Sequence, residues 1–144
     1  MKRIRKVCLS LILMIVFPFS CFSESTGSEN STDYDWTPVI EAIIGVESEG
    51  NSKAVSGNSC GAMQITPVLV KECNSILRRK GSKKRFSLRD RFSINKSKEM
   101  FLLIQSFYNP LHSVEMAIRA WNGGIHYSVK RTQRYYDRVM NRMK

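Results

Sequence analysis

The chain has 144 residues, of which 42% are hydrophobic and 24% charged, so it is long enough for one packed domain and is neither a disordered tail nor a multispanning membrane protein. Its 23 Lys and Arg residues against 12 Asp and Glu residues give a net charge of +11, which attracts anionic partners. Four cysteines without a C-x-x-C pair, two histidines and no glycine-rich phosphate-binding motif argue against a zinc site and a nucleotide enzyme. No cofactor is expected.

The first predicted element is a secretory signal peptide over residues 1–23. Four basic residues precede an apolar stretch of 11 residues, shorter than the roughly 20 that span a membrane as a helix. Cleavage after Ser23 leaves 19 basic and 12 acidic residues, a net charge of +7. We therefore expect an exported protein of the periplasm or cell envelope. The alternatives are an N-terminal membrane anchor and a lipoprotein acylated at Cys21, although Pro18 and Phe19 are unfavourable before a lipid-accepting cysteine.

A flexible lead-in over residues 24–35 and a domain over residues 36–144 are predicted next, because the lead-in is polar and has nothing to bury. Capping residues, glycine and proline stops, and apolar side chains at helical spacing predict five helices in the domain. Their expected starts are Thr37, Thr66, Ser97, Ser113 and Thr132, and the first four end near Gly50, Gly81, Tyr108 and Gly123. The basic connection over residues 81–95 is expected to be a partly docked loop. No alternating pattern persists, so the predicted fold is a single, mainly α domain.

Cysteines and histidines offer few candidates for reactive chemistry. Cys60 and Cys73 remain after the signal peptide, and in an oxidising compartment they are a candidate disulfide pair; two buried free thiols are the alternative. His112 and His126 each lie beside a predicted loop and lack an acidic partner at ligand spacing, so both are expected at the surface or near helix ends. No metal site is predicted.

Glu47 is the candidate catalytic residue. It follows Ile40 and Ile43 at helical spacing and so projects from the buried face of the first helix. Desolvation raises the pKa of such a carboxyl from about 4.3 toward the range of about 6–7 that suits a general acid. Glu49 points to nearly the opposite side and cannot pair with it. The alternative is a buried glutamate satisfied by a tyrosine, a basic residue or backbone N–H groups.

Three segments of the chain carry distinctive motifs: residues 47–67, residues 120–124 and residues 132–139. They resemble motifs of the soluble lytic transglycosylase family, which belongs to the lysozyme-like superfamily. The family pattern Glu-Ser, Ala-x-Ser, Gly-Leu-Met-Gln and Pro is similar to Glu47-Ser48, Ala54-Val55-Ser56, Gly61-Ala62-Met63-Gln64 and Pro67. Its Ala-Tyr-Asn-Ala-Gly segment resembles Ala120-Trp121-Asn122-Gly123-Gly124, and its closing Thr-x-x-Tyr-x-x-x-Val resembles the run from Thr132 through Tyr135 to Val139. The chain departs from the pattern at Ala62, which replaces Leu, and in residues 56–61, which are one residue short.

The resemblance implies a small lysozyme-like domain with a substrate cleft that cleaves the MurNAc–GlcNAc β-1,4 bond of peptidoglycan. Glu47 would protonate the glycosidic oxygen and then act as a base, while the substrate's N-acetyl group assists and the 6-hydroxyl attacks, leaving a 1,6-anhydromuramyl end. Amides suit the hydrogen-bonding groups of a glycan, and small residues allow a sugar to approach the backbone closely. The expected substrate-binding residues are Ser56, Gly61, Ala62, Gln64, Asn122 and Tyr135, the hydroxyl of Tyr135 contacting Glu47.

Other functions stay open at this point. A hydrolytic muramidase on the same fold would use water and a second carboxylate, for which Asp90 is the candidate. A non-catalytic glycan-binding or assembly protein and a cationic protein acting on anionic membranes are further alternatives. The basic residues 83–91 are expected to form a solvated face, and a groove wall attracted to an anionic wall polymer is the alternative. Nucleic-acid binding is not expected, because Phe86 and Phe92 fit the required interleaved aromatics only loosely and because export argues against it. We expect a monomer whose partner is the peptidoglycan glycan strand. The minimal size of the mature domain resembles that of transglycosylases in secretion, conjugation or phage assemblies.

Overall fold

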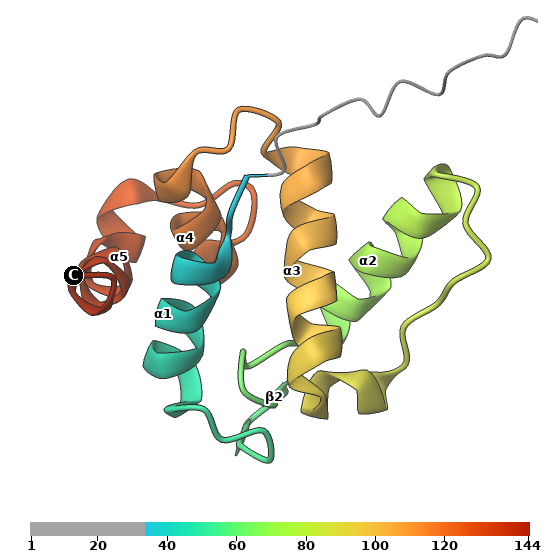
Figure 1. The fold of residues 1–144 in the computed structure, drawn as a ribbon, viewed down its shortest axis with the longest axis horizontal. Helices are drawn as coiled ribbons and strands as arrows, with labels where there is room; N and C mark the ends of the chain where they lie inside the picture. Colours follow the sequence, from blue (N-terminus) through green and yellow to red (C-terminus); the bar gives the residue numbers. More distant parts are fainter. Residues whose placement is uncertain (1–33) are drawn as a thin grey trace, which may run out of the picture. The chain divides into compact units, whose positions relative to one another are not determined.

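Short turns connect a series of helices in residues 34–144, the part of the chain that the computed structural model describes (Figure 1). The predicted signal peptide and almost all of the predicted lead-in lie outside the described residues. The elements are α1 (Thr37–Ser48), β1 (Val55–Ser56), β2 (Ser59–Cys60), α2 (Pro67–Arg79), the 3-10 helix η1 (Leu88–Phe92), α3 (Ile94–Tyr108), α4 (Val114–Gly123) and α5 (Val129–Arg142). The predicted mainly α architecture of five α-helices is confirmed for this range.

Side-chain caps begin four of the helices. The Oγ1 of Thr66 accepts a hydrogen bond from the backbone N–H of Leu69 at 3.2 Å, which satisfies one of the N–H groups that a helix start leaves without a partner. Ser93, Ser113 and Ser128 cap α3, α4 and α5 in the same way. The predicted starts of α2 and α4 are therefore confirmed.

Three predicted helix starts are wrong, each for a local reason. Thr37 is already helical, and the N-terminus of α1 carries no side-chain cap. Ser97 and Thr132 lie one turn inside α3 and α5, because Ser93 and Ser128 upstream supply the caps. Both inner side chains are buried, and their hydroxyls donate to the backbone carbonyls of Arg91 and Ser128, so neither side chain caps a helix start.

The core lies around α3, which runs through the middle of the described domain with α1, α4 and α5 on one side and α2 on the other (Figure 1). Side chains with less than 2% exposure come from every α-helix and from the segment after β2: Val39, Ile43, Met63, Ile65, Ile76, Met100, Phe101, Ile118 and Val139. Burying each large apolar side chain stabilises the fold by about 1.5–3 kcal/mol. Within residues 34–144, no helix combines the length and the apolar character needed to cross a membrane.

Arg119 fixes α5 against α4. Its side chain is 3% exposed, and its guanidinium donates to Glu115 at 2.7 Å, to the carbonyl of Val129 at 3.1 Å and to Gln133 at 2.9 Å. The guanidinium also lies 4.3 Å from the centre of the Tyr136 ring, a cation–π distance. A buried cation with all of these partners sets the position of α5, and α5 in turn supplies the residues that hold Glu47.

The candidate disulfide between Cys60 and Cys73 is not formed. Both cysteines are buried and both are free thiols. The Sγ of Cys73 contacts the carbonyl of Met100 at 3.8 Å, and burial, with a smaller contribution from Glu72, raises the pKa of this thiol to about 12. A thiol that stays protonated is a poor nucleophile and behaves as a small apolar core side chain.

Candidate functional site

Glu47 lies in the last turn of α1, and the chain turns away directly after it. Glu49 and Gly50 adopt the left-handed backbone conformation, with φ of 54° and 88°, and this ends the helix. The hydroxyl of Ser48 donates to the carbonyl of Ala62 at 2.8 Å and ties the helix end to the segment after β2. Glu49 is exposed, so it does not pair with Glu47. The end of α1 therefore presents a single carboxylate.

Helix α5 holds this carboxylate. The hydroxyl of Tyr135, whose side chain is 9% exposed, donates a hydrogen bond to Oε1 of Glu47 at 2.7 Å. One turn further along α5, Arg138 donates to the carbonyl of Val46 at 3.1 Å, beside Glu47 in sequence. The neighbouring Tyr136 faces Arg119 instead. Of the two adjacent tyrosines, Tyr135 is thus the one that contacts Glu47.

The surroundings of Glu47 favour the protonated acid. Burial raises the pKa of the Glu47 carboxyl above its ordinary value, while the hydrogen bond from Tyr135 and the positive charge of Arg138 oppose the rise. Burial, together with the adjacent Glu47, also raises the pKa of Tyr135, so its phenol stays a donor. A fixed carboxyl with a raised pKa is the arrangement that a general acid requires near neutral pH.

The hairpin of β1 and β2 forms the facing wall. Ser56 pairs with Ser59, and Cys60 makes a further bridge with Ile65. At Gly61 the backbone has a φ of 79°, and a Cβ there would lie 1.7 Å from the carbonyl oxygen of Arg91. Glycine is therefore required at this position because the backbone of η1 packs directly against it.

Two amide side chains present polar groups to the pocket. Gln64 has a φ of 48° and donates its Nε2 to the carbonyls of Gly61 at 2.9 Å and Ala54 at 3.4 Å. Its amide oxygen is left without a hydrogen-bond partner within residues 34–144. Asn122, near the end of α4, is exposed, and its amide likewise makes no hydrogen bond with another described residue. Both amides are thus available to a ligand.

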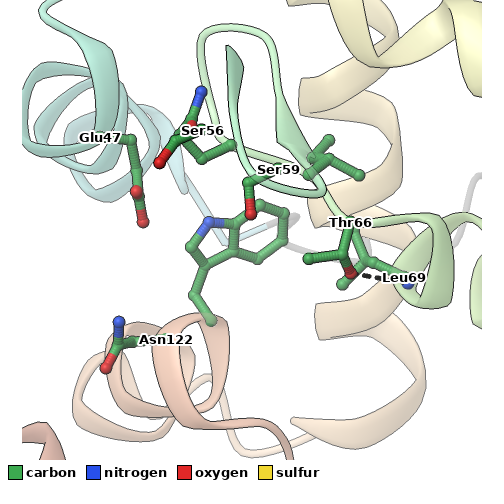
Figure 2. Close-up of a pocket in the computed structure, with 9 residues that line it drawn as sticks. Glu47, Ser56, Ser59, Thr66, Leu69 and Asn122 are labelled. Carbon is green, nitrogen blue, oxygen red and sulfur yellow. Dashed lines mark hydrogen bonds between the residues drawn. The ribbon is translucent and has the colours of Figure 1, made fainter. Parts of the chain in front are cut away.

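These side chains meet around a pocket of about 250 Å³. Figure 2 shows Glu47 on one side, Ser56 and Ser59 on the hairpin, Thr66 and Leu69 at the start of α2, and Asn122 on α4. The lining residues are Glu47, Ser56, Ser59, Gln64, Ile65, Thr66, Leu69, Trp121 and Asn122. Glu47 is the only one of these that carries a charge.

The structure brings four of the predicted site residues together in this pocket: Glu47, Ser56, Gln64 and Asn122. Tyr135 contacts Glu47 without lining the pocket. None of the residues of α5 lines the pocket. This helix supports Glu47 from behind because Tyr135 is buried there.

Gly61 and Ala62 do not line the pocket, contrary to the prediction. Both are buried, Ala62 at 1% exposure, because Gly61 packs under the backbone of Arg91 and Ala62 accepts the hydrogen bond of Ser48. Their small size serves the packing between the hairpin and its neighbours. A direct contact between these two residues and a ligand in the pocket has no support in this geometry.

Asp90 is not placed to act as the second carboxylate of a hydrolytic muramidase. It lies in η1, inside the segment expected to be a loop, where its Oδ2 accepts hydrogen bonds from the backbone N–H and the hydroxyl of Ser87 at 2.6 and 3.1 Å. This is a capping box at the start of η1. Asp90 does not line the pocket, so the pocket has no second carboxylate.

Several pocket residues were not predicted. Trp121 lines the pocket, donates its Nε1 to the carbonyl of Met63 at 3.2 Å and packs 5.3 Å from the ring of Phe101. Its position next to Asn122 in the second motif was the available signal. Ser59, Ile65, Thr66 and Leu69 lie near the first motif but carry no distinctive chemistry. Arg91 and Arg138 do not line the pocket but support residues around it: Arg91 donates to the carbonyls of Asn58 and Ile65, and Arg138 to that of Val46. No local sequence pattern marks either arginine.

The arrangement is suited to acid catalysis on a polar, neutral ligand. One carboxyl with a raised pKa faces hydroxyl and amide groups, which are the partners that hydroxyl and acetamido groups of a ligand require. Within residues 34–144, no group of three or more His, Cys, Asp or Glu side chains is placed to hold a metal ion. The chemistry available from these residues is proton transfer by a single acid.

Comparison with known proteins identifies the family of the chain. A family model described as the transglycosylase SLT domain matches residues 24–141, which include the hairpin, α1 to α4 and all but the last residue of α5. No curated protein and no solved structure matches the chain. The matched range contains both the pocket and the α5 residues behind it.

Proposed function

The chain belongs to the transglycosylase SLT family, whose activity is directed at peptidoglycan, and we propose that it cleaves the MurNAc–GlcNAc β-1,4 bond of the glycan strand with Glu47 as the catalytic acid and base. The observation that carries the proposal is the single carboxyl at the pocket, hydrogen-bonded by Tyr135 at 2.7 Å and raised in pKa by burial. Glycosidases that use two carboxylates hold both at the scissile bond. A site with one acid favours a mechanism in which the substrate supplies the second group.

In the proposed reaction, Glu47 transfers its proton to the glycosidic oxygen as the bond to the anomeric carbon breaks. The N-acetyl group of the same muramic acid stabilises the positive charge that develops at this carbon. Glu47, now a carboxylate, removes the proton of the 6-hydroxyl, whose oxygen bonds to the anomeric carbon. The products are a 1,6-anhydromuramyl end and a free 4-hydroxyl, and Glu47 is again protonated.

The positioning of Glu47 fits both halves of this cycle. As an acid it benefits from burial, and as a carboxylate it is stabilised by the Tyr135 hydroxyl and by the positive charge of Arg138. The Oε1 atom bonded to Tyr135 is held in place, which leaves Oε2 as the oxygen that exchanges the proton. Ser56, Gln64 and Asn122 supply hydroxyl and amide groups for the sugars on either side of the bond.

We further propose export to the periplasm or cell envelope, because the substrate lies there and residues 1–23 have the composition of a signal peptide. The net positive charge suits an anionic wall. Local opening of the wall for a secretion, conjugation or phage assembly is the role proposed for this activity. Loss of export on deleting residues 1–23 tests the localisation.

The activity is tested by digesting purified sacculi with the protein and with Glu47→Gln. We expect release of muropeptides to fall by about 10²- to 10⁴-fold, the usual contribution of a general acid. Glu49→Gln is the matched control, because Glu49 carries the same charge two residues away but is exposed. Equal release by Glu47→Gln and the unmodified protein would exclude Glu47 as the acid. Binding without release by the unmodified protein would leave a non-catalytic glycan-binding protein.

A further inference from the structure

A second hollow is lined by residues of α2 and of the segment that leads to η1; this segment runs beside α2 in Figure 1. We call it the α2 groove; it has a volume of about 540 Å³ and its lining includes Lys71, Asn74, Arg78, Arg85, Phe86 and Leu88. The side-chain amide of Asn74 donates to the carbonyl of Phe86 at 2.8 Å and accepts from its N–H at 2.7 Å. This double hydrogen bond clamps the two walls together, so the groove is preformed.

The α2 groove is positively charged and has an apolar floor. Lys71 and Arg78 lie on one face of α2 at helical spacing, Arg85 lies on the opposite wall, and no acidic residue lines the groove. Within residues 34–144, the side chains of Lys71 and Arg78 form neither an ion pair nor a hydrogen bond. Phe86 and Val70, 6% and 4% exposed, lie beneath them. Unpaired cations beside an apolar surface attract an anion that also has apolar parts.

The α2 groove adjoins the Glu47 pocket. Thr66 and Leu69 line the pocket, whereas the next residue after each, Pro67 and Val70, lines the groove. Because consecutive residues of a helix point about 100° apart, the two hollows lie on neighbouring faces of the first turn of α2. A helix with its side chains is about 10–12 Å across, and an extended tetrapeptide reaches roughly 14 Å. A short peptide attached to a sugar in the pocket is long enough to enter the groove.

We propose that the α2 groove binds the stem peptide of the glycan strand being cleaved, with Lys71, Arg78 and Arg85 contacting its carboxylates. The inference rests on the proposed function, because it assumes that the glycan occupies the Glu47 pocket. A stem peptide combines carboxylates with small apolar side chains, and it branches from the muramic acid at the scissile bond. An anionic polymer without apolar parts would make no use of the floor formed by Phe86 and Val70.

The test compares two substrates: glycan strands that carry stem peptides, and strands stripped of them. In the double variant Lys71→Gln/Arg78→Gln we expect KM for peptide-bearing strands to rise about three- to tenfold, as for the loss of two exposed charge pairs. Activity on stripped strands should not change. The control is Lys130→Gln/Arg134→Gln on α5, which removes the same charge from exposed residues outside both hollows. The control should match the unmodified protein on both substrates.

Three results would overturn the proposal. They are an equal loss on stripped and peptide-bearing strands, an equal loss in the α5 control, which would indicate general attraction to an anionic polymer, and no loss at all. A second measurement is independent of catalysis: titration of free stem tetrapeptide into Glu47→Gln, followed by NMR. We expect binding that disappears when Lys71→Gln/Arg78→Gln is added. Failure of the proposed function would instead appear as no cleavage of either substrate by the unmodified protein.

Discussion

Glu47 must be buried enough to hold a proton and must still release it during each turnover, and its surroundings serve both needs at some cost in stability. Burial raises the pKa of Glu47 in the folded protein above its value in the unfolded chain. The folded state then binds the proton more tightly than the unfolded state does. The stability gained from this tighter binding is fully present below the unfolded pKa and is lost as pH rises through the folded pKa. Glu47 therefore destabilises the protein when it is ionised.

We predict from this that Glu47→Gln raises the melting temperature at about pH 8, where the glutamate is ionised, and that the difference shrinks near about pH 4. Glutamine keeps the shape of the side chain and an oxygen that accepts from Tyr135. Thermal unfolding followed by circular dichroism at the two pH values measures the effect. A lower melting temperature of the variant at about pH 8 would contradict a destabilising carboxylate.

Arg138 tunes the same carboxyl. Its positive charge lowers the pKa of Glu47, so Arg138→Gln should raise that pKa and extend the activity to higher pH, since the reaction begins with protonated Glu47. The profile of kcat/KM against pH measures the shift of its alkaline limb. Arg134→Gln is the control, because it removes the same charge from an exposed residue one turn earlier on α5. A shift of equal size in both variants would mean that net charge, not proximity to Glu47, sets the profile.

The hairpin that walls the pocket depends on close packing against η1. We predict that Gly61→Ala destabilises the fold by about 2–5 kcal/mol, because a left-handed residue gains a side chain and because the added Cβ meets the backbone of Arg91. Gly57→Ala is the matched control: its φ is also positive, at 56°, but nothing lies within 4 Å of the added Cβ. That change should cost only about 1–2 kcal/mol. Urea unfolding of both variants provides the comparison, and equal losses would disprove the packing argument.

At the scale of elements, the sequence was most informative where a signal is local. The Thr66-Pro67 start of α2 and the Ser113 start of α4 were predicted because the capping residue stands directly before the apolar pattern. The starts of α3 and α5 were placed one turn late, since Ser97 and Thr132 look like caps but are buried in the helices. The 3-10 helix at Leu88–Phe92 was missed because a single short turn has no periodic pattern.

At the scale of the whole domain, the site is built from residues that are far apart in the chain. Only the family resemblance predicted that these residues would contact one another. Glu47 and Tyr135 are 88 positions apart and meet because the Arg119 contacts hold α5 against α4. Gly61 was predicted to contact the substrate because a glycine allows a sugar to approach the backbone closely. Glycine is instead required there by the backbone of Arg91, which packs against Gly61 and which the sequence does not reveal. Long-range packing of this kind cannot be derived from spacing.

The positive charge of the whole chain should make binding to the wall sensitive to salt. We predict that retention of Glu47→Gln on sacculi falls steeply as salt rises from about 0.1 M to about 1 M, where the screening length drops from about 10 Å to about 3 Å. Co-sedimentation measures the retained fraction. Binding that is indifferent to salt would mean that charge plays no part. Leakage of anionic lipid vesicles caused equally by Glu47→Gln and the unmodified protein would favour the alternative of a membrane-active protein.

The central claim is that one acid, Glu47, cleaves the glycan by transferring the bond to the 6-hydroxyl of the substrate. Mass spectrometry of the muropeptides released from purified sacculi, with Glu47→Gln run in parallel, tests this most directly. We predict 1,6-anhydromuramyl ends that are absent when Glu47 is replaced. Reducing ends, which contain one more water, would contradict the transglycosylase mechanism and identify a hydrolytic muramidase.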